Sequence, residues 1–178
     1  AKKTGDAVEL RVHPALIDRN EMIAKVDGVM NGVSVVGDCV GETMYYGPGA
    51  GGDATASSVI SDIIDIVRNG SNSPMLGFKN VLEGSVLKLK KADDIFTKYY
   101  IRIEVEDRIG VLSKISNILG EHDISINSFI QKQSSETQNA TLLFSTHQCF
   151  EKNIQSAIKD LGVCDFIRKK PVMIRIEE

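Results

Sequence analysis

Residues 47–52, with the sequence Gly-Pro-Gly-Ala-Gly-Gly, have the composition of a turn that contacts a ligand through its backbone. They stand between a strand-like run and a helix-like run, so backbone N–H groups and the positive end of the helix dipole face any bound anion or carbonyl. A purely structural role is the alternative, because Gly and Pro also populate tight strand-to-helix turns. The stretch matches neither G-x-G-x-x-G nor G-x-x-x-x-G-K-[ST], and no remainder of a βαβ nucleotide-binding unit follows it. The chain therefore holds no complete nucleotide-binding fold of its own.

A second polar turn, Asp-Arg-Ile-Gly at residues 107–110, precedes a helix-like run that begins at Val111. The first amides of a helix have no partners within it and can bind a carboxylate, while the Asp107 carboxylate can accept from an ammonium group. Gly110 permits close approach of the backbone to a ligand. The alternative is that Asp107 only caps the helix. The turn is a candidate site for a small zwitterion.

The remaining polar residues form no catalytic or metal-binding constellation. His13 lies in an apolar run, which favours a structural role, and Asp38 and Glu42 are expected at solvated positions rather than in an active-site cleft. His122 and His147 have no companion at the spacing of metal ligands. We expect no catalytic residue and no metal site within the chain.

Composition excludes several classes of protein. The 178 residues are 42% hydrophobic, enough for the core of one or two domains, and 21 basic against 24 acidic residues give no field that attracts nucleic acid. No apolar run approaches the roughly 20 residues of a membrane span, and no signal-peptide pattern opens the chain. Three cysteines without C-x-x-C spacing indicate reduced thiols in or near a core. A cytoplasmic protein without nucleic-acid or membrane partners is expected, and the start at Ala1, close to strand-like sequence, indicates a fragment.

Residues 99–178 alternate between strand-like and helix-like patterns in the order βαββαβ, which predicts a ferredoxin-like domain. Strands are indicated by apolar residues at every second position, and helices by apolar residues three and four apart. The expected elements are a strand at 101–106, a helix at 111–119, hairpin strands at 124–130 and 141–146, a helix at 150–161 and a strand at 172–176.

The first 69 residues are expected to form strands at 10–16 and 32–46, with a short helix or loop at 17–26 between them. A helix follows the glycine-rich turn, with Asp53 or Thr55 as its cap. Its apolar stripe consists of Ala56, Val59, Ile60, Ile63, Ile64 and Val67. Gly, Ser, Asn and Pro then mark a helix stop. The predicted fold is therefore α+β, with a first segment at 1–69, a linker at 70–98 and the ferredoxin-like domain at 99–178.

Four stretches of the first segment resemble homoserine dehydrogenase: Val-His-Pro-Ala-Leu-Ile at 12–17, Val-Ser-Val-Val-Gly-Asp at 33–38, the run at 41–52, and Ala-Thr-Ala-Ser-Ser-Val at 54–59. The resemblance implies an NAD(P)-dependent enzyme that interconverts aspartate semialdehyde and homoserine, a step toward threonine and methionine. It also implies that residues 1–69 are the end of a dehydrogenase catalytic region. In that region the glycine-rich turn returns the chain to the nucleotide domain and lies beside the cofactor, with contacts from Gly47, Gly49, Ala50 and Gly51.

The family's dinucleotide fingerprint, catalytic lysine and acidic residues lie upstream of the portion matched here. We therefore expect no bound cofactor and no activity from this chain alone, because hydride transfer requires both the cofactor fold and the proton-transfer groups. The residue that distinguishes NAD from NADP also lies outside the chain, so the preference stays open.

The turn at 107–112 and the residues Ile-Ser-Ile-Asn at 124–127 resemble the ACT domain over residues 99–178. The resemblance implies regulation by a small amino acid, threonine first, bound at an interface between paired domains of a homodimer or higher oligomer. The expected contacts are Asp107, Gly110, Val111, Leu112, Ser125 and Asn127. A stand-alone ACT-type binding and dimerisation module without dehydrogenase activity is the alternative. An RNA-recognition motif shares the βαββαβ order but needs strand aromatics, of which residues 101–106 and 141–146 hold only Phe144.

Overall fold

The computed structural model describes residues 1–70, 87–133 and 138–177, with only the backbone described for Asn69 and Gln133. The chain divides into two compact units. The first consists of Ala1–Ile17 and Leu87–Glu178, and the second of Asp18–Val86. Within the described residues, two sheets belong to the first unit and one to the second.

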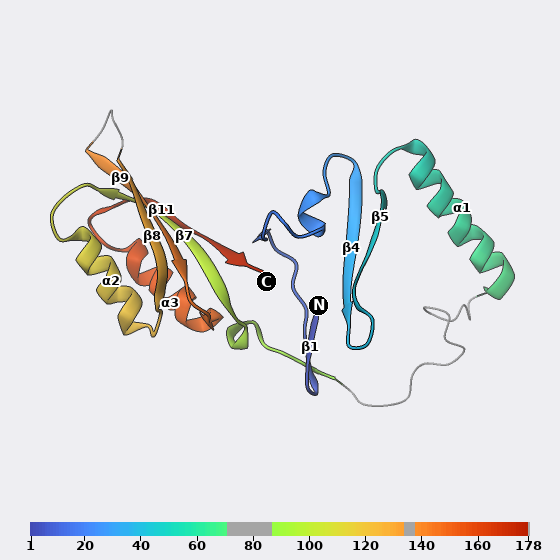
Figure 1. Cartoon of the computed structure of the whole chain (residues 1–178), viewed down its shortest axis with the longest axis horizontal. Helices are drawn as coiled ribbons and strands as arrows, with labels where there is room; N and C mark the ends of the chain where they lie inside the picture. Colours follow the sequence, from blue (N-terminus) through green and yellow to red (C-terminus); the bar gives the residue numbers. More distant parts are fainter. Residues whose placement is uncertain (71–86, 134–137, 178) are drawn as a thin grey trace. The chain divides into compact units, whose positions relative to one another are not determined.

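The first unit contains the predicted βαββαβ order, which confirms the ferredoxin-like fold (Figure 1). The elements are β7 (Phe96–Glu106), α2 (Val111–Glu121), β8 (Ile126–Gln133), β9 (Asn139–Thr146), α3 (Glu151–Gly162) and β11 (Ile167–Ile176). The sheet order is β3-β11-β7-β9-β8, with the two-residue strand β10 (Cys149–Phe150) paired to β7. Strands β7 and β9 are central, so their inward side chains are the best shielded from water.

Burial follows the predicted periodicities. Alternate residues of β7 and β9 are buried, and α2 and α3 contribute one apolar stripe each. Fully burying one large apolar side chain contributes roughly 1.5–3 kcal/mol to folding. The core formed in this way comprises Tyr99, Ile101, Ile103, Val105, Val111, Ile115, Leu119, Ile124, Ala140, Leu142, Phe144, Cys149, Ile154, Ala157, Leu161 and Phe166.

The first 17 residues pack with this domain. Strand β3 (Ala15–Leu16) extends the sheet parallel to β11, and the Glu177 amide donates to the Leu16 carbonyl at 2.9 Å. Strands β1 (Lys2–Thr4), β2 (Ala7–Glu9) and β6 (Lys88–Leu89) form a separate three-stranded sheet. This grouping differs from the predicted division at residues 69 and 99, because pairing between short strands far apart in sequence leaves no local periodic signal.

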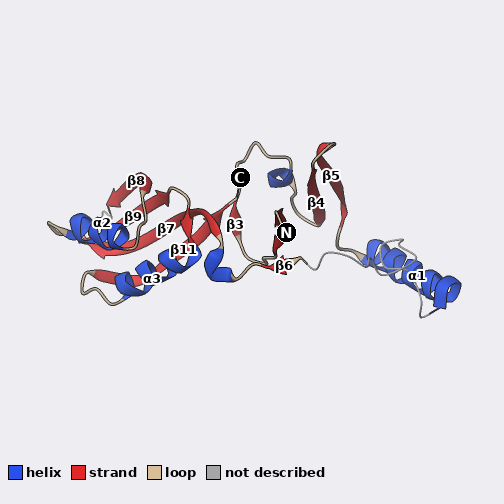
Figure 2. Ribbon diagram, turned by 90° about the horizontal axis from the view of Figure 1, so that it is seen from below, coloured by secondary structure: helices blue, strands red, loops and turns tan. Residues whose placement is uncertain are grey.

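The second unit contains a β-hairpin and a helix, drawn in red and blue in Figure 2. Strands β4 (Met30–Gly37) and β5 (Gly41–Pro48) pair antiparallel from Met30 opposite Pro48 to Gly37 opposite Gly41. Helix α1 (Gly52–Asn69) follows the glycine-rich turn, as predicted. No helix in the described ranges is long and apolar enough to cross a bilayer.

Several predicted features of the first segment are wrong. The strand expected at 32–46 is a hairpin with its turn at residues 38–40, after which β5 begins at Gly41 with φ 74°, and the strand expected at 10–16 is reduced to β3. Between them, residues 17–26 contain a short 3-10 helix, Ile23–Lys25, in agreement with the short helix or loop expected there. The N-cap of α1 is Gly51, with no side-chain cap, so neither Asp53 nor Thr55 occupies that position. Cys39 is exposed, whereas Cys149 is buried and Cys164 is half-buried.

Candidate functional site

The glycine-rich turn is shaped by two glycines that a side chain would disturb. The Gly49 amide donates to the Val29 carbonyl at 2.9 Å, and a Cβ on Gly49 would clash with the Asn31 side chain. Gly51 has φ 118° and ψ 154°, a conformation that is essentially restricted to glycine. The backbone path between β5 and α1 therefore requires glycine at both positions.

The start of α1 offers backbone donors next to this turn. Thr55 N–H closes the first helical turn by donating to the Gly51 carbonyl at 3.1 Å, and the amides before it have no partner within the helix. A Cβ on Gly47 would meet no atom within 4 Å, and Ala50 is exposed. Asp53 lies in the first helical turn, where its negative charge opposes an anion. The turn can therefore position a ligand but holds no group for proton transfer.

Glu42, His13 and His122, which the sequence analysis singled out, have structural contacts. Ser34 Oγ donates to Glu42 Oε1 at 2.7 Å across the hairpin, and His13 Nδ1 lies 2.9 Å from the Pro14 carbonyl oxygen. His122 Nε2 lies 2.7 Å from Asp160 Oδ2. Within residues 1–70, 87–133 and 138–177, no three His, Cys, Asp or Glu side chains form a group able to hold a metal ion.

The turn between β7 and α2 has the form expected of a ligand-binding loop. Gly110 is the N-cap of α2 and adopts the left-handed conformation at φ 88°, so the N-cap position is not taken by Asp107. Val111 is buried, whereas Leu112 is 41% exposed at the surface of the first helical turn. Asp107 N–H donates to the Gln138 carbonyl at 2.8 Å, and Asp107 Oδ1 accepts from Gln131 Nε2 at 3.3 Å. The loop is anchored while the helix N-terminus faces outward.

An ion pair that the sequence did not indicate fixes the same loop. Arg108 Nη2 lies 2.5 Å from Asp165 Oδ2, and this hydrogen bond holds the pKa of Asp165 below its ordinary value. Glu106, the last residue of β7, pairs with Arg168 at 2.6 Å. These partners are about 60 residues apart in sequence, so no local pattern could reveal them.

Ser125 and Asn127, the other predicted effector contacts, lie at the opposite end of α2. Asn127 falls at a register irregularity between Ile126 and Ser128, and its Nδ2 donates to Ser145 Oγ at 3.2 Å. The 11 residues of α2 span about 16 Å at 1.5 Å per residue. A single domain therefore keeps the two predicted halves of the effector site apart.

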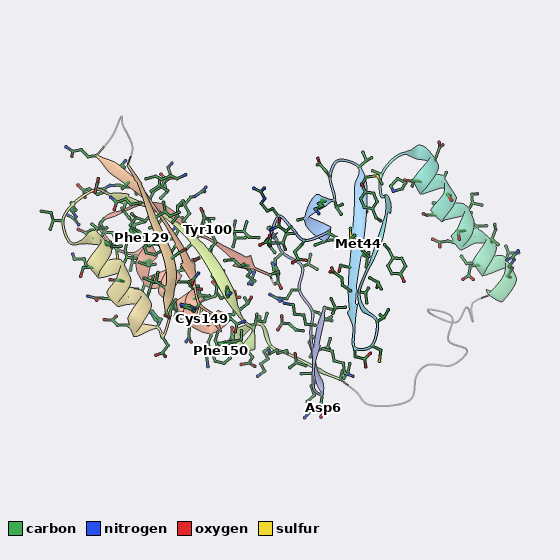
Figure 3. All side chains as sticks on the ribbon, in the orientation of Figure 1. Asp6, Met44, Tyr100, Phe129, Cys149 and Phe150 are labelled. Carbon is green, nitrogen blue, oxygen red and sulfur yellow. The ribbon has the colours of Figure 1, made fainter. Side chains whose placement is uncertain are left out.

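A buried polar network connects side chains of β7, α3 and β11. Glu151 accepts from the Tyr99 hydroxyl at 2.8 Å, from Gln155 Nε2 at 2.7 Å and from Arg175 Nε at 2.8 Å. Burial raises the pKa of Glu151, but these hydrogen bonds outweigh burial and lower it. Burial also raises the pKa of Cys149, labelled in Figure 3, to about 11, so this thiol is protonated at neutral pH.

Comparison with protein-family models gives two matches. Residues 1–64 match the homoserine dehydrogenase model, and residues 99–164 match the ACT domain model. The glycine-rich turn lies within the first match and the loop between β7 and α2 within the second. Each candidate site thus belongs to a separately identified family segment.

Known relatives match nearly the whole chain. Homoserine dehydrogenases of Helicobacter pylori and Neisseria gonorrhoeae are 50% and 42% identical over 99% of the chain, which spans 41% of each. The crystal structure of a homoserine dehydrogenase from Thiobacillus denitrificans is 36% identical, with a TM-score of 0.77 over 98% of this chain and 40% of that one. The chain spans about two fifths of the curated relatives it matches. The chain is therefore similar to homoserine dehydrogenases over nearly its whole length, with an ACT domain in its second half.

Proposed function

We propose that this chain is the regulatory end of an oxidoreductase, a homoserine dehydrogenase of threonine and methionine biosynthesis in the cytoplasm. The observation that carries the proposal is the joint occurrence, in one chain, of the dehydrogenase segment and the ACT domain in the arrangement of its relatives. The complete protein interconverts L-aspartate 4-semialdehyde and L-homoserine, and the ACT domain adjusts that activity.

The glycine-rich turn supplies one wall of the NAD(P) site in the complete protein. The small residues of the turn and the unpaired amides at the start of α1 suit close approach of a cofactor. The proposed contacts are Gly47, Gly49, Ala50 and Gly51. When bound, the nicotinamide ring accepts or donates the hydride, while these residues only position it.

Because the turn is only one wall, the chain alone is predicted not to oxidise homoserine. The measurement is the absorbance of reduced nicotinamide, with NAD and NADP tested separately in a preparation free of host enzyme. A complete homoserine dehydrogenase under the same conditions is the positive control. Formation of reduced nicotinamide above the blank would show that the chain contains the groups we assign to the rest of the protein.

The ACT domain is proposed to bind an amino-acid effector, threonine first, between two copies of the chain. Asp107, Gly110, Val111 and Leu112 of one copy would meet Ser125 and Asn127 of the other. This follows from the positions of the two sets at opposite ends of α2, because a two-fold axis perpendicular to the helix places each end beside the opposite end of the partner.

Strand β8 is suited to such pairing. It is the outer strand of the sheet beyond β9, so one row of its backbone groups has no neighbouring strand within the described sheet. An uncovered edge readily pairs with another chain, and two sheets joined in this way lose one exposed edge each. The homodimer and the effector site are therefore parts of one proposal.

A further inference from the structure

A small pocket in the first unit lies apart from both candidate sites. Its volume is about 190 Å³, and its walls come from the N-terminal segment, the residues before β7, and β11. The lining residues are Leu10, Arg11, Val12, His13, Lys90, Ala92, Ile95 and Arg175. Four of these eight side chains carry basic nitrogen atoms, and the other four are apolar.

Two of the basic side chains retain capacity to bind a further anion. Arg175 donates hydrogen bonds from Nε and Nη2 to the Glu151 carboxylate, which fixes the orientation of its guanidinium. Its Nη1 has no hydrogen bond to the described residues. The only ion pair of Lys90 in the described ranges is with Glu9, at 3.5 Å, longer than an ordinary hydrogen bond. Arg175 is thus a preorganised donor, and Lys90 is a weakly engaged one.

Arg11, in contrast, is already engaged on both sides of its guanidinium. Its Nε lies 2.7 Å from Glu9 Oε1, and its Nη2 donates to Glu177 Oε2 at 3.2 Å. These pairs hold the N-terminal segment against the end of β11 and so fix the pocket wall. Arg11 builds the pocket rather than providing its free donor.

The charge around the pocket matches a single negative charge. The lining side chains and their ion-pair partners provide four cations, Lys2, Arg11, Lys90 and Arg175, against three carboxylates, Glu9, Glu151 and Glu177. Without His13, the cluster has a net charge of one positive unit. A monoanion neutralises this charge, whereas a phosphate dianion would leave a net negative charge. A planar carboxylate also suits the guanidinium of Arg175.

Size and apolar lining define the rest of the ligand. At about 190 Å³ the pocket is small, so only a ligand of a few non-hydrogen atoms fits within it. Leu10, Val12, Ala92 and Ile95 offer apolar surface to a short hydrocarbon chain. We propose that this pocket binds a small aliphatic monocarboxylate, with its carboxylate at Lys90 and Arg175. The proposal is independent of the effector site at the start of α2.

The test is a titration of the 178-residue chain with isovalerate, followed by amide chemical shifts in a phosphate-free buffer of low ionic strength. We expect saturable shifts concentrated in residues 10–13, 90–95 and 175. Lys90→Gln should weaken binding about tenfold, because it removes a charge-assisted contact. Lys91→Gln, which removes the neighbouring lysine outside the pocket lining, is the matched control and should leave binding unchanged.

Arg175→Lys keeps a cation beside Glu151 and is also expected to weaken binding, whereas Arg175→Gln would leave that carboxylate buried without its charge partner. Isovaleramide has nearly the same shape without the charge and should not bind.

The proposal is overturned if no saturable shift appears up to about 20 mM isovalerate, a concentration that would detect even a site with a millimolar dissociation constant. It is also overturned if isovaleramide binds equally well, or if Lys90→Gln and Lys91→Gln weaken binding equally. The same shifts with inorganic phosphate alone would likewise contradict it. Threonine binding at the ACT loop is measured separately, so neither result decides the other.

Discussion

Glu151 is a carboxylate with only 4% of its side chain exposed, held by Tyr99, Gln155 and Arg175. Burying a charge costs free energy unless it is paired and hydrogen-bonded, and here both conditions are met. Burial, together with the hydrogen bond to Glu151, raises the pKa of the Tyr99 hydroxyl. Glu151 thereby joins the start of α3 to β7 and β11, and it orients Arg175 at the pocket wall.

Glu151→Gln is predicted to destabilise the ACT domain by about 3 kcal/mol at neutral pH, because it leaves Arg175 without its charge partner. The folded-state pKa of Glu151 lies below its ordinary value of 4.5, so its contribution is complete above that pH and is lost as pH falls further. The difference between wild type and variant should therefore shrink below about pH 4.5. Urea unfolding at pH 7 and at several pH values below 4.5 measures it.

Glu104→Gln is the matched control for this experiment. Glu104 pairs with Lys169 at 2.8 Å, but the two side chains are 31% and 72% exposed, and exposed pairs contribute about 1 kcal/mol or less. Equal effects of the two substitutions at pH 7 would contradict the importance assigned to the buried network.

At the scale of elements, the sequence predicts what depends on local periodicity. The alternation of Ile101, Ile103 and Val105 and the helical spacing of Val111 and Ile115 are enough to indicate β7 and α2, both of which are present. The pairing of β2 with β6 and of β3 with β11 depends on distant partners that no periodic pattern identifies.

The same distinction applies to the candidate sites. The position of the glycine-rich turn and of the Gly110 loop follows from glycine and capping patterns. The anchors of that loop, such as Arg108 with Asp165, come from distant parts of the chain and became visible only in the structure. The pattern of residues 32–46 predicts strand but not the hairpin of β4 and β5, because only three residues, 38–40, separate the valine-rich β4 from β5.

Gly51 provides the element-scale prediction. With φ at 118°, Gly51→Ala should destabilise the junction of β5 and α1 by about 1–3 kcal/mol, since L-residues are strained in that conformation. Gly52→Ala, one residue later, has open space around its Cβ and replaces a glycine inside the helix, so it should be neutral or stabilising. Amide hydrogen exchange in the first two turns of α1 measures both. Indistinguishable exchange in the two variants would refute the strained turn.

At the scale of the whole molecule, the two units differ in how their apolar residues are covered. The main core cluster lies entirely within residues 99–166 of the first unit. In the second unit, the apolar residues of α1 are 45–79% exposed: Val59, Ile60, Ile63, Ile64, Ile66 and Val67. A helix with this much exposed apolar surface normally packs against further protein, which agrees with relatives more than twice as long.

The chain is predicted to form a dimer through its ACT domains, because the outer edge of β8 is uncovered. Light scattering at high micromolar concentration should give twice the mass of 19.5 kDa per chain, or a higher even multiple. A dilution series separates specific pairing, which has one dissociation constant, from progressive aggregation through exposed apolar surface. A monomer throughout the series would remove the interface on which the effector site depends.

The most direct test of the regulatory assignment is calorimetric titration of the chain with threonine, methionine, isoleucine and lysine, each separately at millimolar concentration. Threonine is predicted to bind saturably, and Asp107→Ala or Asn127→Ala to weaken it about tenfold or more, because each removes a hydrogen bond to a charged group. Asn117→Ala, at an exposed position within α2, is the control and should bind like wild type. If both site variants bind threonine as tightly as wild type, the effector binds at another place in the chain. If none of the four amino acids gives heat or raises the melting temperature, the proposed sensing function is contradicted.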